Sequence, residues 1–123
     1  MPDPETLADF VDRFAAWWRA PDPEALPTVL GPDVHLAAPL TEETFGLLDA
    51  QEGFRTLLAG IPDLTGEVHR WGPHPDGVFI EFTLRGTIGD RTVAIRAVDD
   101  FLVGDDGLAT ERISYFDPSQ LLG

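Results

Sequence analysis

Residues 78–103 read VFIEFTLRGTIGDRTVAIRAVDDFLV, and this stretch decides the fold class. Apolar and polar side chains alternate on both sides of Gly89-Asp90, which is the pattern of two antiparallel strands joined by a tight turn. With a two-residue turn, the apolar faces of the strands at 78–88 and 92–103 coincide. The expected pairs on that face are Ile80 with Asp99, Phe82 with Ala97 and Leu84 with Ile95. A single carboxylate, Asp99, therefore interrupts an apolar inner surface.

Two further stretches with strand character flank this hairpin, at residues 67–71 and 108–116. Pro-Asp-Gly and Gly-Asp-Asp-Gly turn signals separate them from the hairpin. The C-terminal half is therefore expected to form a four-strand antiparallel meander.

The N-terminal half has helical character. Apolar residues recur at helical spacing over residues 4–19, and Asp3 is a suitable N-cap before Pro4. The expected elements after it are a short helix from Asp22 to Gly31-Pro32, a strand at 34–36, a loop at 41–48 and a helix that stops near Gly60. We expect a single α+β domain over residues 1–123, a cone-shaped, barrel-like, curved antiparallel sheet with three helices on its concave face.

The charge balance excludes several function classes. The 123 residues include 22 Asp and Glu against 8 Arg, with a formal net charge of -14. Such an excess of carboxylate repels phosphate backbones and anionic lipid, so neither nucleic acid nor a membrane is an expected partner. The chain has no Lys and no Cys, which removes Schiff-base, P-loop and thiolate chemistry. We expect no metal and no cofactor.

The first residues, Met1-Pro2-Asp3-Pro4-Glu5, lack the basic and then apolar run of a signal peptide. No apolar stretch approaches the roughly 20 residues of a membrane span. We therefore expect a cytoplasmic protein.

Asp99 is the residue that requires an explanation. A turn centred on Asp105-Asp106 would place Arg112 opposite Asp99, whereas a three-residue turn would place Ile113 there. An adjacent guanidinium predicts that the pKa of Asp99 lies below that of a free aspartate. Asp99 and Arg112 then form either a structural cross-strand ion pair or the working groups of a pocket beneath the helices.

Several stretches carry a family resemblance, namely Val11-Asp12-Arg13-Phe14-Ala15-Ala16, residues 34–39, and residues 96–101 continuing through Gly107 to Ser114-Tyr115-Phe116-Asp117. With them, nearly the whole chain resembles the SnoaL-like and ketosteroid-isomerase-like families of the nuclear-transport-factor-two-like superfold. These stretches mark the fold, which hosts many activities.

The resemblance also implies roles for single positions. The isomerase-like pattern places its oxyanion-hole tyrosine at Phe14, its general-base aspartate at Ala38 and its second, protonated acid at Asp99. Only the last group is present. The catalytic aspartate of limonene epoxide hydrolases falls on Ser114, so steroid-type isomerisation and that hydrolase assignment both lack residues.

The resemblance implies a protein that binds small molecules. One reading is a cofactor-free acid/base enzyme, of cyclase, isomerase or dehydratase type, acting on a hydrophobic polyketide-, terpenoid- or steroid-like substrate. The alternative is a non-catalytic ligand carrier or a dimeric interaction module on the same fold.

The candidate site combines two groups for chemistry with a set of lining residues. We expect Asp99 and Arg112 to be catalytic. The expected substrate-binding residues are Phe14, Trp18, Ala38, Phe54, Ile80, Phe82, Phe101, Ser114 and Phe116. A homodimer is expected through the outer sheet face, which carries Phe79, Ala94, Val98 and Leu102.

Overall fold

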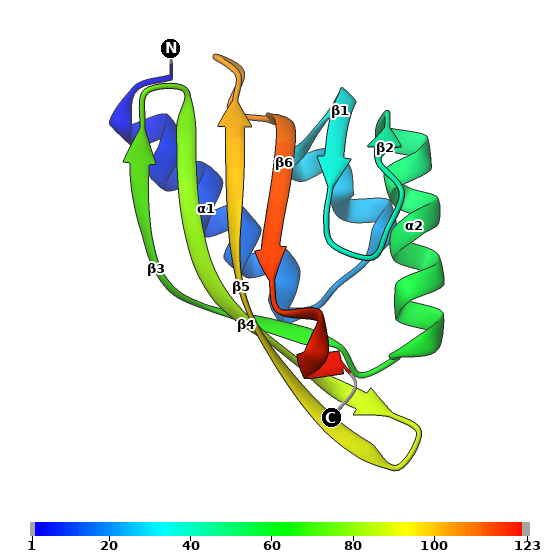
Figure 1. The fold of residues 1–123 in the computed structure, drawn as a ribbon. Helices are drawn as coiled ribbons and strands as arrows, with labels where there is room; N and C mark the ends of the chain where they lie inside the picture. Colours follow the sequence, from blue (N-terminus) through cyan, green and yellow to red (C-terminus); the bar gives the residue numbers. More distant parts are fainter. Residues whose placement is uncertain (1, 122–123) are drawn as a thin grey trace.

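A curved six-stranded sheet, covered on one side by helices, forms the body of the protein (Figure 1). The structure is a computed structural model and describes residues 2–121; Met1, Leu122 and Gly123 lie outside the described residues. In chain order the elements are α1 (Pro4–Arg19), η1 (Pro23–Thr28), β1 (Leu30–Ala37), β2 (Thr44–Phe45), α2 (Leu47–Gly60), β3 (Thr65–His74), β4 (Gly77–Ile88), β5 (Arg91–Val103), β6 (Ala109–Phe116) and η2 (Pro118–Leu121).

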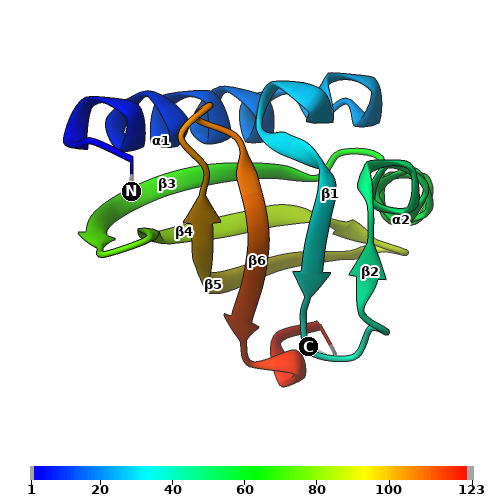
Figure 2. The same ribbon diagram turned by 90° about the horizontal axis from the view of Figure 1, so that it is seen from above.

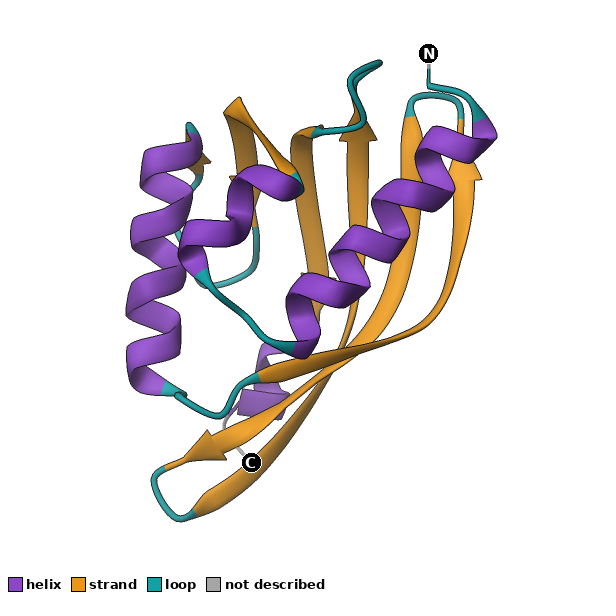
Figure 3. Ribbon diagram, turned by 180° about the vertical axis from the view of Figure 1, so that it is seen from behind, coloured by secondary structure: helices purple, strands orange, loops and turns teal. Residues whose placement is uncertain are grey.

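The strand order is β2-β1-β6-β5-β4-β3. The α+β class and the three helices over one face of the sheet are confirmed: Figure 2 shows α1 lying across the sheet with α2 beside β1 and β2, and Figure 3 shows α1, η1 and α2 on the same side. One strand pair differs from the expected antiparallel arrangement, because β1 runs parallel to β6. The sheet is also open, with β2 and β3 at its edges, and is not a closed barrel.

The N-terminal connections differ from the expected boundaries. The second helix is a short 3-10 helix that ends at Thr28, and Gly31-Pro32 lies inside β1. The pairing of β1 with β6 is irregular between Leu30 and His35, which accommodates the proline that cannot donate a ladder hydrogen bond. The expected loop at 41–48 contains β2 and the first two residues of α2.

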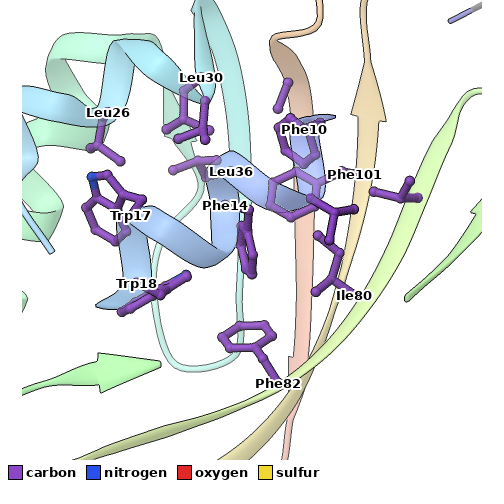
Figure 4. Packing of buried hydrophobic residues seen from close by; sticks show 14 of the residues in the cluster. Phe10, Phe14, Trp17, Trp18, Leu26, Leu30, Leu36, Ile80, Phe82 and Phe101 are labelled. Carbon is purple, nitrogen blue, oxygen red and sulfur yellow. The ribbon is translucent and has the colours of Figure 1, made fainter. Parts of the chain in front are cut away.

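Helix α1 supplies one side of the core. Asp3 caps it by accepting a hydrogen bond from the Thr6 backbone N–H at 2.8 Å, as the sequence predicted. Its inward face is aromatic, and Figure 4 shows Phe10 and Phe14 meeting Phe101 of β5. The ring centroids of Phe10 and Phe101 are 4.9 Å apart in an edge-to-face arrangement.

The register of the β4–β5 hairpin is the expected one. Ile80 pairs with Asp99 and Phe82 pairs with Ala97 across the Gly89-Asp90 turn. This register places Asp99 on the inner face of the sheet, as the sequence predicted.

The expected register of the next pair is wrong by two residues. Asp99 lies opposite Ser114, and Arg112 lies opposite Phe101. The connection is longer than a tight turn, since the Gly104 N–H donates to the Leu108 carbonyl and a bulge follows Leu102. A shift of two residues preserves which side chains face inward, so Arg112 and Ser114 remain on the face of Asp99. Among the described residues, no helix is long and apolar enough to cross a membrane.

Candidate functional site

A cavity of about 310 Å³ lies between α2, the segment at 38–44 and the inner face of the sheet. This is the lower end of the range of roughly 300–1,000 Å³ for small-molecule sites. Its apolar lining residues include Trp18, Leu36, Ala38, Phe54, Leu57, Ile61, Phe82, Leu84, Ile95, Ala97 and Phe116. Two ionisable side chains, Asp99 and Arg112, line it together with the hydroxyl groups of Thr41, Thr44 and Ser114.

Helix α2 forms the wall opposite the sheet. Its position is fixed at η1, where the Gln51 side-chain amide donates to the Pro23 carbonyl at 3.1 Å. Arg55 of α2 also pairs with Glu24 of η1. Phe54 faces inward from this helix and meets Trp17 edge to face at 5.1 Å. The helix thus covers the sheet without filling the space beneath it.

Most of the residues expected to bind a substrate line this cavity. They are Trp18, Ala38, Phe54, Phe82, Ser114 and Phe116, in addition to Asp99 and Arg112. Phe14 and Phe101 do not line it. They bound a neighbouring gap of about 20 Å³ that shares Arg112 with the cavity. Ile80 is fully buried in the core and lines neither space.

Asp99 lies at the base of the cavity. Its side chain is 1% exposed, and its Oδ1 atom has no hydrogen-bond partner within residues 2–121. Buried polar groups are usually paired, because an unpaired one loses its water without compensation. Asp99 is therefore a residue of the cavity wall with a buried oxygen that no side chain or backbone group of the described residues satisfies.

Burial raises the pKa of the Asp99 carboxyl above its ordinary value, and this outweighs the opposing effects of the Arg112 charge and the Ser114 hydroxyl. The expectation of a lowered pKa is therefore wrong. Arg112 is displaced along β6 to the position opposite Phe101, and in the described part of the chain it forms no ion pair with Asp99 within 4.0 Å. The low-polarity surroundings favour the neutral acid.

Arg112 is also incompletely satisfied. Its Nε atom is buried and has no hydrogen-bond partner among the residues described. Leu36 lies beside it on the parallel strand β1, and Phe101 lies beside it on β5. The cavity therefore presents a carboxyl group of raised pKa and a cation from one sheet surface, on side chains diagonal to each other across β5 and β6.

The sequence did not identify the residues that close the cavity. Leu40 and Thr41 come from an irregular segment, Thr44 begins β2, and Gly53 and Leu57 come from α2. Leu84, Ile95 and Ala97 could have been found, since the alternation of the hairpin already placed them on the inner face with Asp99. In residues 2–121 no three His, Asp or Glu side chains come together as a possible metal site.

Three solved structures of the same fold illustrate the range of related proteins. One, assigned as a SnoaL-like polyketide cyclase from Jannaschia sp. CCS1, has a TM-score of 0.83 and 18% identity over 99% of this chain and 94% of its own. An LEH-like epoxide hydrolase from M. tuberculosis has a TM-score of 0.79 and 21% identity over 96% of this chain and 87% of its own.

The third is SalBIII, an epoxide hydrolase/cyclase-like enzyme of pyran-ring formation in the polyether salinomycin. It has a TM-score of 0.84 and 16% identity over 98% of this chain and 97% of its own. At these identities the similarity establishes the fold alone.

No curated protein sequence matches the chain significantly. The sequence model of the SnoaL-like domain matches residues 11–112, which include the second half of α1, the β4–β5 hairpin and both ionisable groups of the cavity. The chain therefore belongs to the SnoaL-like domain family.

Proposed function

We propose that this protein binds a hydrophobic small molecule in the cavity and that Asp99 donates a proton to an oxygen of that molecule. The observation that carries the proposal is the Asp99 carboxyl, which is 1% exposed and has an Oδ1 atom without a partner among the described residues. A carboxyl group whose pKa is raised by burial holds its proton to higher pH and can serve as a general acid. Polyketide-, terpenoid- or steroid-like molecules match the apolar lining.

The remaining polar groups of the cavity support reactions that begin by protonating the substrate. Arg112 can stabilise negative charge that develops near Asp99, and the Ser114 hydroxyl lies on the residue paired with it. Ala38 and Phe14 stand where the isomerase-like enzymes have a base and a tyrosine. Acid-assisted cyclisation therefore fits these residues better than isomerisation through an enolate, and better than epoxide hydrolysis, whose catalytic aspartate would fall on Ser114.

A second candidate is a ligand carrier or interaction module. Phe14 and Ala38 favour this second candidate, because neither side chain supplies the tyrosine hydroxyl or the base that would cooperate with Asp99. Such a protein would bind the same apolar ligands without turnover. Binding and turnover must therefore be measured separately.

Binding can be tested by thermal unfolding and by tryptophan fluorescence, since Trp18 lines the cavity. A ligand at about 100 times its Kd is expected to stabilise the fold by about 2.7 kcal/mol. In an Ala97→Leu variant the larger side chain extends from the inner face into the cavity and should abolish this stabilisation. Ala94→Leu, on the outer face of the same strand, is the matched control and should leave it unchanged. Equal ligand responses of the two variants would place the binding site elsewhere.

We further propose that two copies associate through the outer sheet face. Phe79 and Tyr115 are 46% and 56% exposed there, beside half-buried Val98 and Leu102. Phe79→Asp combined with Tyr115→Asp is expected to convert the dimer to a monomer in sedimentation analysis. Leu48→Asp, at an exposed position of α2, should leave the mass unchanged. A monomeric parent protein would contradict the proposal.

A further inference from the structure

We propose that the ligand of this cavity carries an anionic oxygen group, such as a carboxylate or an acidic enol, which pairs with Arg112 while its apolar body contacts the remaining walls. This inference rests on the proposed function and narrows its ligand class. It is carried by the position, burial and missing partners of two side chains, Arg112 and Asp99.

Arg112 is the one cationic side chain among the residues that line the cavity. It projects from β6 between Leu36 of β1 and Phe101 of β5, so apolar neighbours flank it on both sides. A charge in such surroundings is poorly screened, and its interactions are much stronger than at the protein surface. The recognition of ligand charge therefore depends on this side chain.

The other arginines do not share its situation. Arg13 and Arg91 donate to backbone carbonyls, and Arg55 and Arg70 pair with glutamates. Three more, Arg19, Arg85 and Arg96, are exposed and can be satisfied by water. Arg112 differs because its Nε is buried without a partner and no carboxylate within the described residues lies within 4.0 Å of it.

The charge balance of the cavity follows from these contacts. Burial of Asp99 favours its neutral form, which leaves the Arg112 guanidinium without a counter-ion. Arg112 is half-buried and its Nε atom is cut off from water, so a ligand anion that pairs with the guanidinium would compensate for the lost hydration. Guanidinium and carboxylate groups also match in shape, because two parallel N–H groups can donate to the two oxygens.

The net charge of -14 does not prevent the cavity from binding an anionic ligand. Charges on the surface are screened over about 8 Å at physiological ionic strength. Arg112 acts at contact distance inside an apolar cavity, where screening is weak. Burial favours the protonated form of Asp99, and in that form the carboxyl can donate a hydrogen bond to the same ligand without repelling it.

The test compares two probes of equal size, naphthalene carboxylate and naphthalene carboxamide, titrated at neutral pH and followed by tryptophan fluorescence. The carboxylate is expected to bind the parent protein roughly 10-fold to 100-fold more tightly, as a charged hydrogen-bonded contact would provide. Arg112→Met should remove this preference, because it keeps the apolar stem and deletes the charge. Arg85→Met is the matched control: it changes the net charge equally at an exposed position outside the cavity, so the preference should persist.

The outcomes separate this inference from the proposed function. Equal binding of both probes to the parent protein would overturn the inference and leave an apolar binding site in place. Failure of both probes to bind would overturn the proposed function as well. Should Arg112→Met not fold, Arg112→Gln serves as a second variant, and the preference of the parent protein is decisive without either.

Discussion

An Asp99→Asn variant is expected to lose turnover by about 100-fold or more and to unfold at a higher temperature than the parent protein at neutral pH. The loss of turnover follows because an amide cannot donate and recover a proton. The gain in stability follows because burial raises the pKa of the Asp99 carboxyl. One substitution thus separates a working acid from a structural ion pair.

The pH dependence has a definite sign. In the unfolded chain Asp99 ionises near its ordinary pKa of 3.8, whereas in the folded protein the raised pKa keeps it protonated to higher pH. Between the two values the folded state holds one more proton, so the free energy of unfolding falls as pH rises, by at most about 1.4 kcal/mol per pH unit for this group. Below the pKa of Asp99 in the unfolded chain, the destabilisation by the buried carboxylate is absent. Above its pKa in the folded protein, the destabilisation is constant, because the carboxyl is then ionised in both states.

The measurement is urea unfolding of the parent and Asp99→Asn at a series of pH values from 4 upward. The stability of the variant relative to the parent is expected to increase with pH, since asparagine does not titrate. In a structural pair with Arg112 the pKa of Asp99 in the folded protein would lie below its ordinary value of 3.8, so the relative stability would stay nearly constant over the measured range. A relative stability that does not increase with pH would falsify the neutral-acid assignment.

A Phe101→Ala variant is expected to lower the free energy of unfolding by about 3–5 kcal/mol. Phe101 is 2% exposed and contacts two rings of α1, with centroid distances of 4.9 Å to Phe10 and 5.4 Å to Phe14. Removing the ring leaves a void at the centre of the helix–sheet interface. That void would join the gap of about 20 Å³ already beside Arg112.

Phe79→Ala provides the matched control for this prediction. Phe79 lies on the outer face of the neighbouring strand and is 46% exposed, so its truncation should cost about 1 kcal/mol or less in a monomeric background. Urea unfolding of both variants gives the comparison. Similar losses for the two phenylalanines would mean that the helix layer does not depend on Phe101.

The sequence predicted the parts of the site that depend on local pattern. Alternation over β4 and β5, with a turn at Gly89-Asp90, placed Asp99 on the inner face opposite Ile80. The register of β6 was not accessible in the same way, because the connection at 104–108 is stabilised by its own backbone hydrogen bonds and is longer than its Gly-Asp-Asp-Gly signal indicates. The two-residue shift left Arg112 and Ser114 on the inner face but changed which residues of β5 they lie opposite.

The sequence by itself therefore determined which residues face inward, since side-chain direction in a strand has a period of two and survives an even shift of register. Only the tertiary structure decided which residues surround Asp99 and Arg112 on the inner face of the sheet. The other walls of the cavity that Asp99 lines come from α2, the 38–44 segment and Trp18 of α1, which are distant from β5 along the chain. Desolvation depends on the sum of those contacts, and no local pattern encodes it. That is the physical reason why the pKa of Asp99 was predicted in the wrong direction from an adjacent arginine alone.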